Sequence, residues 1–252
     1  MQIAVNSEVQ LDSLQISGAT NNGSVRNGYG ITCGPNVGGA QGPVTLSLSD
    51  VLLTSNASDG LSALQSTLTI QRSEFSNNGG NGITSTSSPL SCDRCRITTN
   101  HGGYGLSTQG SNYAITNSFI VRNDGIGALL GAVVAEGKFD FNTVVDNVGG
   151  VHLVNAPTSA FLSHDNLVIR NGASNVDFSG CTPSPCSSPG SIIADSAATL
   201  HFVSPDAQPY DYHLGAGSVA IDAATSTVTV HDFDGDARPK GAARDVGADE
   251  AF

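Results

Sequence analysis

Short apolar segments alternate with polar turns along this chain, and the turns share an Asn with Gly close behind, as in "VRNDG" at 121–125 and "VIRNG" at 168–172. Successive Asn residues of this kind are separated by 29, 22, 22, 23, 24 and 24 residues, and they are Asn27, Asn56, Asn78, Asn100, Asn123, Asn147 and Asn171. Self-similarity with a period of 20–50 residues is typical of solenoid proteins. We therefore expect the chain to wind in coils of about 22–24 residues.

Apolar residues hold fixed positions within each repeat. One column stands three residues before the Asn and comprises Leu53, Phe75, Ile97, Ile120, Val144 and Val168. Other apolar columns lie two residues apart within a segment, and period-two alternation indicates β-strands. Three such segments per repeat, with no helical stretch between them, predict an all-β fold: a single-stranded, right-handed, parallel β-helix with three sides. The Asn column is expected to occupy a tight turn at positive φ, with each amide bonding to the Asn one rung away.

Charged residues directly before the Asn form a strip on successive rungs, namely Arg122, Asp146 and Arg170. Two interpretations stay open. The strip is either a structural charge ladder, whose exposed pairs are each worth about 0–1 kcal/mol, or a surface that binds carboxylates or sugars. Extra residues at 34–42, 179–191 and 85–90 predict loops that project from one corner of the coil, where a ligand groove is expected.

Composition narrows the partner classes. The chain has 30 Gly and only 13% charged residues, which disfavours helices. Its net charge is −12, and Lys138 and Lys240 are its two lysines, so the clustered basic surface that nucleic acid requires is missing. No apolar run is long enough for a transmembrane segment, and no signal peptide is visible, so we expect a mature or excised fragment.

The repeated pattern, as in "FSNNGGNGI" at 75–83, resembles that of the pectate-lyase-like β-helix family over about residues 9–200. The segment after 200 is similar to the C-terminal region of secreted bacterial β-helix proteins. The similarity lies in "DYHL" at 211–214, "SVAID" at 218–222, "DFDGDARP" at 232–239 and "DVGADE" at 245–250. The resemblance implies an exported, surface-associated bacterial protein. Residues 1–200 are expected to form the parallel β-helix. Residues 201–252 are expected to form a cap that covers its last coils, because an open solenoid end exposes apolar residues and strand edges.

The cap carries oxygen-rich side chains that suggest a metal site. Asp232, Asp234 and Asp236 alternate around a Gly, as hard ligands for calcium would. A complete EF-hand loop is excluded, because Ala243 stands at its twelfth position. The alternative is a structural turn in which Arg238 pairs with Asp222 or Asp245. The histidines share no zinc-binding spacing and are expected to be ordinary hydrogen-bonded residues: His101, His152, His164, His201, His213 and His231.

The five cysteines suggest an oxidising compartment. Cys181 and Cys186 bracket a Pro-rich loop and are expected to form a disulfide. Cys92 and Cys95 either pair as well or remain thiols, and Cys33 is expected to be free and buried.

Three classes of function compete. A β-helix lyase needs a basic residue beside acidic ones in a groove, yet Lys138 has only Ala114 and Leu162 beside it by column. A hydrolase needs paired carboxylates, and no such constellation is found. We therefore expect a secreted or cell-surface module that recognises a polysaccharide or surface glycan without catalysis. A polysaccharide lyase or hydrolase, and a structural stalk, are the alternatives. No cofactor is expected, unless it is calcium.

Overall fold

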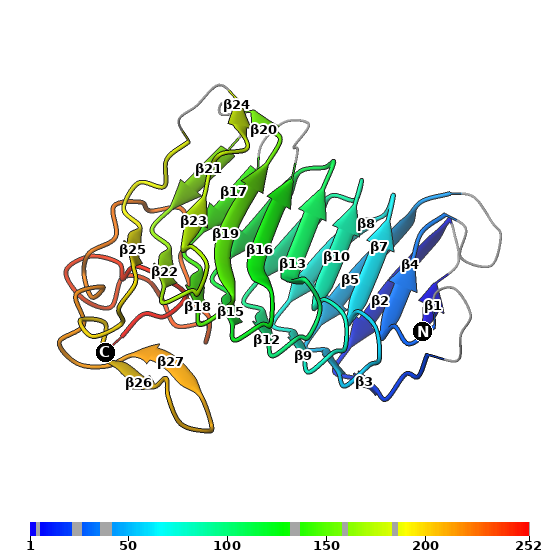
Figure 1. The fold of residues 1–252 in the computed structure, drawn as a ribbon, viewed down its shortest axis with the longest axis horizontal. Coiled ribbons are helices and arrows are strands. Elements are labelled where there is room, and N and C mark those ends of the chain that lie inside the picture. The colour runs from blue at the N-terminus through cyan, green and yellow to red at the C-terminus, as the bar shows by residue number, and fades with distance from the viewer. Residues whose placement is uncertain are drawn as a thin grey trace.

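A computed structural model of the chain describes residues 1–3, 6–21, 27–35, 42–131, 137–157, 161–182 and 186–251. Over these ranges the chain winds into a stack of coils whose strands form three long parallel sheets (Figure 1). The N-terminus lies at one end of the stack and the C-terminal segment at the other. The predicted three-sided parallel β-helix is confirmed.

Each long sheet collects the equivalent strands of successive coils. In the described residues the first sheet has eight strands, in the order β1 (Gln2–Ile3), β4 (Ile31–Cys33), β7 (Leu61–Leu64), β10 (Ile83–Thr86), β13 (Tyr104–Gln109), β16 (Ile126–Gly131), β19 (Gly149–Val154) and β23 (Val176–Asp177). The second has seven: β2 (Ser7–Asp12), β5 (Val44–Ser49), β8 (Thr67–Gln71), β11 (Leu90–Asp93), β14 (Tyr113–Thr116), β17 (Gly137–Asp140) and β21 (Phe161–His164). The third has eight: β3 (Gln15–Ser17), β6 (Leu52–Thr54), β9 (Glu74–Ser76), β12 (Arg96–Thr98), β15 (Phe119–Val121), β18 (Thr143–Val145), β22 (Leu167–Ile169) and β25 (Ile192–Ala194).

The predicted apolar column is aligned strand by strand inside the coil. The third sheet pairs Leu53 with Phe75, Phe75 with Ile97, Ile97 with Ile120, Ile120 with Val144, and Val144 with Val168. All six side chains are at most 3% exposed and belong to one core cluster. The register that the repeat predicts is therefore the register of the fold.

An asparagine ladder closes the turn between the third and first sheets. The amide of Asn78 donates to Oδ1 of Asn100 at 2.9 Å, that of Asn100 donates to Asn123 at 3.0 Å, and that of Asn123 donates to Asn147 at 2.9 Å. The rung-to-rung bonding is confirmed, but the expected backbone geometry is wrong. From Asn56 to Asn171, positive φ falls on the residue before each Asn, for example 53° at Thr99. That residue makes the bend, and the bend directs the Asn side chain inward, where the amide satisfies buried backbone groups.

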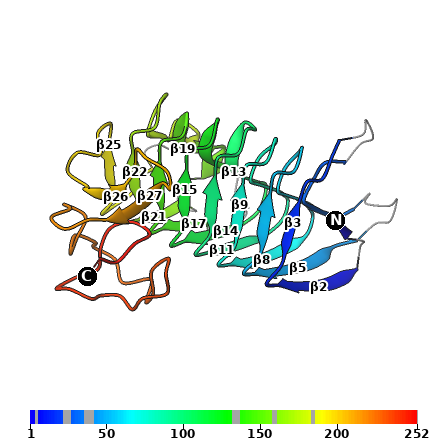
Figure 2. The same ribbon diagram turned by 90° about the horizontal axis from the view of Figure 1, so that it is seen from below.

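The segment after residue 200 packs along the side of the last coils (Figures 1 and 2). It begins with an antiparallel hairpin, β26 (Phe202–Ser204) and β27 (Asp211–Leu214). A second core cluster joins this segment to outward-facing residues of β15, β18 and β22, and it contains Phe119, Val121, Val145, Leu167, Ile169, Phe202, Tyr212, Leu214, Val246 and Ala248. Apart from Thr143, these three strands are apolar on both faces, which is why the segment covers the outer face of the third sheet. A short parallel pair, β20 (Ala156–Pro157) and β24 (Cys181–Thr182), follows β19 and β23 of the first sheet, on the side of the coil opposite the hairpin (Figure 1).

No helix in the part of the chain that the structure describes has the length and apolar character needed to cross a bilayer.

Candidate functional site

The charged strip predicted from the sequence lies on three successive rungs. Arg122, Asp146 and Arg170 have φ values of 56°, 59° and 55°, one position before the buried asparagine ladder. Arg170 binds Asp146 through two hydrogen bonds, from Nε to Oδ1 at 2.5 Å and from Nη2 to Oδ2 at 2.7 Å. Arg122 Nη1 lies 3.5 Å from Oδ2 of the same carboxylate. Asp146 therefore sits between two guanidinium groups, as a charge ladder requires.

The β26–β27 hairpin forms a wall opposite this strip. The Tyr212 hydroxyl donates to Asp146 Oδ2 at 2.6 Å, and Arg170 Nη2 lies 2.9 Å from Asp206 Oδ1. The Arg122 guanidinium lies over the ring of Tyr210, with 3.7 Å between its Cζ and the ring centroid. Hairpin and coil are thus joined by a hydrogen bond, an ion pair and a cation–π contact.

A groove separates the hairpin from the coil. A cleft of about 720 Å³ is lined by Arg122, Asp146 and Arg170 from the coil and by Asp206 and Tyr210 from the hairpin. A second cavity, of about 550 Å³, shares Thr99, Gln208 and Tyr210 with the first and extends to Asn77. We call these two cavities together the hairpin groove. It crosses several rungs, so equivalent positions recur along it at intervals of about 4.8 Å.

The polar groups of the groove hold fixed charge states near neutral pH. The hydrogen bond to Asp146 raises the pKa of Arg170, so its guanidinium stays charged. Burial, followed by the Asp146 contact, raises the pKa of Tyr212, which keeps its hydroxyl neutral and able to donate. The first cleft contains two cations, Arg122 and Arg170, and three carboxylates, Asp124, Asp146 and Asp206, which gives a formal charge of 2 − 3 = −1.

The expected loop groove lies at a different corner. The predicted loops 34–42 and 179–191 follow strands of the first sheet, but residues 36–41 and 183–185 fall outside the described residues. The predicted loop 85–90 is shorter, because 85–86 belong to β10 and 90 to β11. Beside 85–90 there is a smaller cavity of about 350 Å³ that Pro89, Leu90 and Lys138 help to line. Lys138 pairs in register with Ala114 and Leu162, as its column predicts. The larger groove was missed because its second wall comes from the non-repeating segment. Its sequence signal is the cluster of polar and aromatic residues at 206–212.

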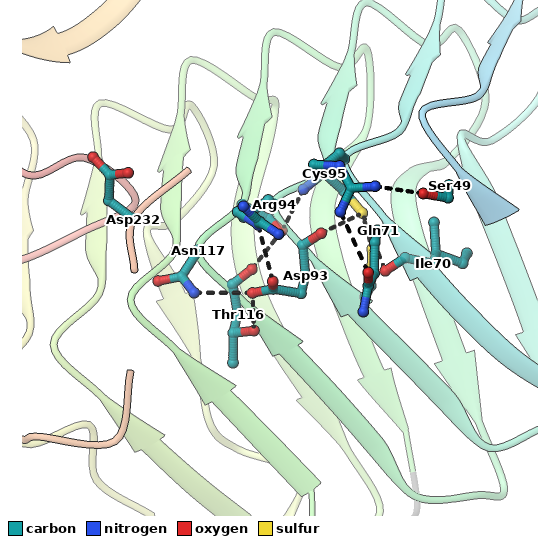
Figure 3. Close-up of polar contacts among 12 residues, drawn as sticks. Ser49, Ile70, Gln71, Asp93, Arg94, Cys95, Thr116, Asn117 and Asp232 are labelled. Carbon is teal, nitrogen blue, oxygen red and sulfur yellow. Dashed lines mark hydrogen bonds and ion pairs between the residues drawn. The ribbon is translucent and has the colours of Figure 1, made fainter. Parts of the chain in front are cut away.

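A second polar corner, between the second and third sheets, is held by contacts within itself (Figure 3). Asp93 accepts hydrogen bonds from Thr116 Oγ1 at 2.7 Å and Asn117 Nδ2 at 2.9 Å, and Arg94 Nε lies 3.2 Å from its other oxygen. One rung earlier, Arg72 makes a two-point ion pair with Asp50. This corner repeats the Arg–Asp motif of the groove without a facing hairpin.

The cysteines fall into two groups. Cys181 and Cys186 form a disulfide in the structure, with Cα atoms 6.0 Å apart. Cys33, Cys92 and Cys95 are free and buried, and the sulfurs of Cys92 and Cys95 lie 2.6 Å apart. Burial raises the pKa of Cys33 to about 11 and also raises that of Cys92, so both thiols stay protonated near neutral pH. A protonated, buried thiol is a poor nucleophile.

The aspartates expected to bind calcium point to different partners. Asp232 is buried and accepts from the backbone of Asp236 and Glu250 at 2.7 and 3.1 Å. Asp234 lies 2.9 Å from His213 Nε2, and Asp236 accepts from Lys240 Nζ at 2.6 Å. In the described residues these three carboxylates do not converge.

Arg238 is buried, and the expected pairing with Asp222 or Asp245 is wrong. Its Nη1 donates to Glu250 Oε2 at 3.1 Å and to the carbonyl oxygen of Asp245 at 2.8 Å. Glu250 is the partner because the chain turns back, so that Arg238 can bind backbone carbonyls and one carboxylate together.

The comparison with protein-family models agrees with this architecture. A family model described as a right-handed β-helix region matches residues 3–167, more than half of the chain, which supports the predicted right-handed winding. A crystal structure of pectate lyase Pel9A matches 100% of this chain and 88% of its own, at 16% identity and a TM-score of 0.39. No curated protein gives a significant match.

Proposed function

Because this chain belongs to the right-handed β-helix family, we propose that it binds a polysaccharide or surface glycan in the hairpin groove, without catalysis. The observation that carries the proposal is the arrangement around Asp146. One cleft crosses several rungs and is open to solvent along its side. It is lined by a carboxylate, two guanidinium groups and the Tyr210 ring. Sugars present hydroxyl groups and apolar ring faces, which such side chains can bind.

The charge of the groove favours a glycan with little net charge. Each arginine already faces a carboxylate, because Arg170 contacts Asp146 and Asp206, and Arg122 contacts Asp146. A polyuronate would add negative charge to a cleft whose formal charge is −1 and to a protein of net charge −12. The hydroxyl groups of a neutral sugar can hydrogen-bond to these arginines and aspartates without breaking the ion pairs between them.

The groove offers poor conditions for acid–base chemistry. Both oxygens of the Asp146 carboxylate already accept hydrogen bonds, Oδ1 from Arg170 and Oδ2 from Arg170 and Tyr212. Lys138 lines a different cavity. A lyase needs an unengaged base beside the sugar carbon that loses its proton, so binding is favoured over lyase or hydrolase activity.

We also propose a secreted or cell-surface location. The Cys181–Cys186 disulfide supports it, since disulfides persist mainly in oxidising compartments.

The test is a glycan array followed by calorimetric titration of the best polysaccharides. Arg170→Gln is expected to weaken binding at least tenfold, and so is Tyr210→Ala. Arg72→Gln is the matched control, because Arg72 makes the same two-point pair with Asp50 but does not line the hairpin groove. No glycan binding, or equal losses in Arg170→Gln and Arg72→Gln, would contradict the proposal. Release of unsaturated products, followed by ultraviolet absorbance, would establish a lyase instead.

A further inference from the structure

Three side chains from separate segments of the C-terminal region converge beside the hairpin. They are His213 on β27, Asp234 in the turn at 232–236, and Asp249 near the C-terminus. One ligand atom from each lies within 4.8 Å of the other two, and in the ranges that the structure describes this is the one His, Cys, Asp or Glu group that does so. The histidine sets this cluster apart from an ordinary acidic surface.

The imidazole is oriented for binding at Nε2. Its Nδ1 faces Asp211 Oδ1, and the backbone N of His213 donates to the same oxygen at 3.0 Å. The ring also packs edge-on against Phe119, with centroids 5.2 Å apart. A carboxylate on Nδ1 fixes the tautomer in which Nδ1 carries the proton, and this is the usual second-shell arrangement of a metal-binding histidine. The lone pair of Nε2 then points away from Asp211.

The atom facing that lone pair is itself an acceptor. Asp234 Oδ2 lies 2.9 Å from Nε2, so Nε2 either carries a second proton and donates it to Asp234, or binds a cation together with Asp234. Asp249, which is only 7% exposed, contributes the third ligand atom, and its Oδ2 accepts a backbone hydrogen bond from Leu214 at 2.7 Å. A second proton on the imidazole, or a metal ion, can each supply the missing positive charge.

We propose that His213, Asp234 and Asp249 bind a divalent first-row transition metal ion such as Zn²⁺, with Asp211 orienting the histidine. One imidazole nitrogen and two carboxylate oxygens suit Zn²⁺ or Mn²⁺ better than Ca²⁺, which takes six to eight oxygen ligands. The side chain of Asp234 is 49% exposed, so the site opens to solvent and leaves room for water as a further ligand. The ion joins β27 to two later segments and stabilises the wall of the hairpin groove.

The experiment is a calorimetric titration of the tag-free, chelator-treated full chain with ZnCl₂, followed by thermal unfolding with and without the ion. One Zn²⁺ per chain is expected, with a higher midpoint of unfolding, because a ligand that binds only the folded state stabilises it. Absence of Zn²⁺ binding would overturn the proposal and leave the proton as the cation.

Variants identify the ligands. His213→Gln, Asp234→Asn and Asp249→Asn are each expected to weaken Zn²⁺ binding more than tenfold, and Asp211→Asn about 10–100-fold. Asp234→Asn keeps the test valid if the more buried variants fail to fold. His201→Gln is the matched control, since His201 lies in the same region, outside the cluster, and its Nδ1 lies 3.1 Å from the Ala216 carbonyl oxygen. Unchanged binding in Asp234→Asn, an equal loss in His201→Gln, or preferential Ca²⁺ binding that Asp236→Asn abolishes would each overturn the assignment.

Discussion

The hydroxyl of Tyr212 donates a 2.6 Å hydrogen bond to the Asp146 carboxylate, and 66 residues of chain separate the two. Tyr212 is 1% exposed, and its ring packs edge-on against Phe202 at 5.5 Å between centroids. Asp146 is held from its other side by Arg170. One buried phenol therefore fixes the hairpin against the charged strip and sets the position of the groove wall.

Replacing Tyr212 with Phe should loosen that wall. The change removes a hydrogen bond to a charged group, and such bonds contribute about 1.5–3 kcal/mol. We expect the free energy of unfolding in urea to fall by about that amount, and glycan affinity to fall with it because Tyr210 and Asp206 lie on the same hairpin.

The control for this prediction is Tyr113→Phe. Tyr113 is buried in the core of the coil, and its hydroxyl has no hydrogen-bond partner among the described residues. Deleting an unsatisfied buried hydroxyl should leave stability unchanged or raise it. Equal losses of stability in the two Tyr→Phe variants would show that the hydrogen bond to Asp146 does not stabilise the fold.

Gly137 makes room for the same Tyr113. The two residues are register partners on β14 and β17, and a Cβ built at Gly137 would overlap the Tyr113 ring. Gly137→Ala is expected to cost about 1–3 kcal/mol, as overpacked cores do. A double-mutant cycle of Gly137→Ala with Tyr113→Leu, measured by urea unfolding, tests whether overlap with the Tyr113 ring causes the loss. Additive effects would mean that the clash lies elsewhere.

The fold could be predicted because each coil repeats the same apolar positions. Leu53, Phe75 and Ile97 occupy one column in the sequence, and they stack because a parallel sheet keeps register from rung to rung. The asparagine ladder followed from the same periodicity. The position of positive φ did not, because the residue before each Asn varies in type and only the backbone shows that it makes the bend.

The groove was predictable only on one side. The repeat places Arg122, Asp146 and Arg170 on successive rungs, but nothing in the repeat says what faces them. Tyr210 and Tyr212 reach the strip because apolar residues on the outer face of the third sheet bind the C-terminal segment. That contact joins distant parts of the chain, and a sequence pattern with a period of about 24 residues does not encode it.

The side chain of Asn100 makes four hydrogen bonds within the ladder. Its amide donates to Asn123 Oδ1 and to the Phe75 carbonyl oxygen, and its own Oδ1 accepts from the backbone and amide of Asn78. Asn100→Ala leaves buried donors and acceptors unpaired, so we expect a loss of about 3 kcal/mol or more in urea unfolding.

The matched control for the ladder is Asn77→Gly. Asn77 directly precedes the ladder residue Asn78 and has a φ of 53°. Its side-chain oxygen accepts an exposed hydrogen bond from the Thr99 hydroxyl. Glycine adopts positive φ without strain, so stability should change by less than about 0.5 kcal/mol. A loss comparable to that of Asn100→Ala would contradict a special role for the buried amides.

Asp245 should make the C-terminal region more stable at mildly acidic pH than at neutral pH. Burial raises the pKa of this carboxyl to about 6, whereas an unfolded Asp titrates near 3.9. Between these two values the folded chain holds a proton that the unfolded chain has released. The contribution of Asp245 to the free energy of unfolding therefore rises as the pH falls from 7 to 4, by an amount on the order of 1 kcal/mol after allowance for screening.

Denaturation of wild type and Asp245→Asn at pH 7, 5 and 4 isolates this effect, because the other carboxylates are common to both chains. The difference between wild type and variant should grow in favour of wild type as the pH falls. Asp50→Asn provides the opposite sign: the hydrogen bond from Arg72 lowers the pKa of Asp50, so its contribution is lost on acidification. If both differences moved in the same direction with pH, burial would not be what sets the titration of Asp245.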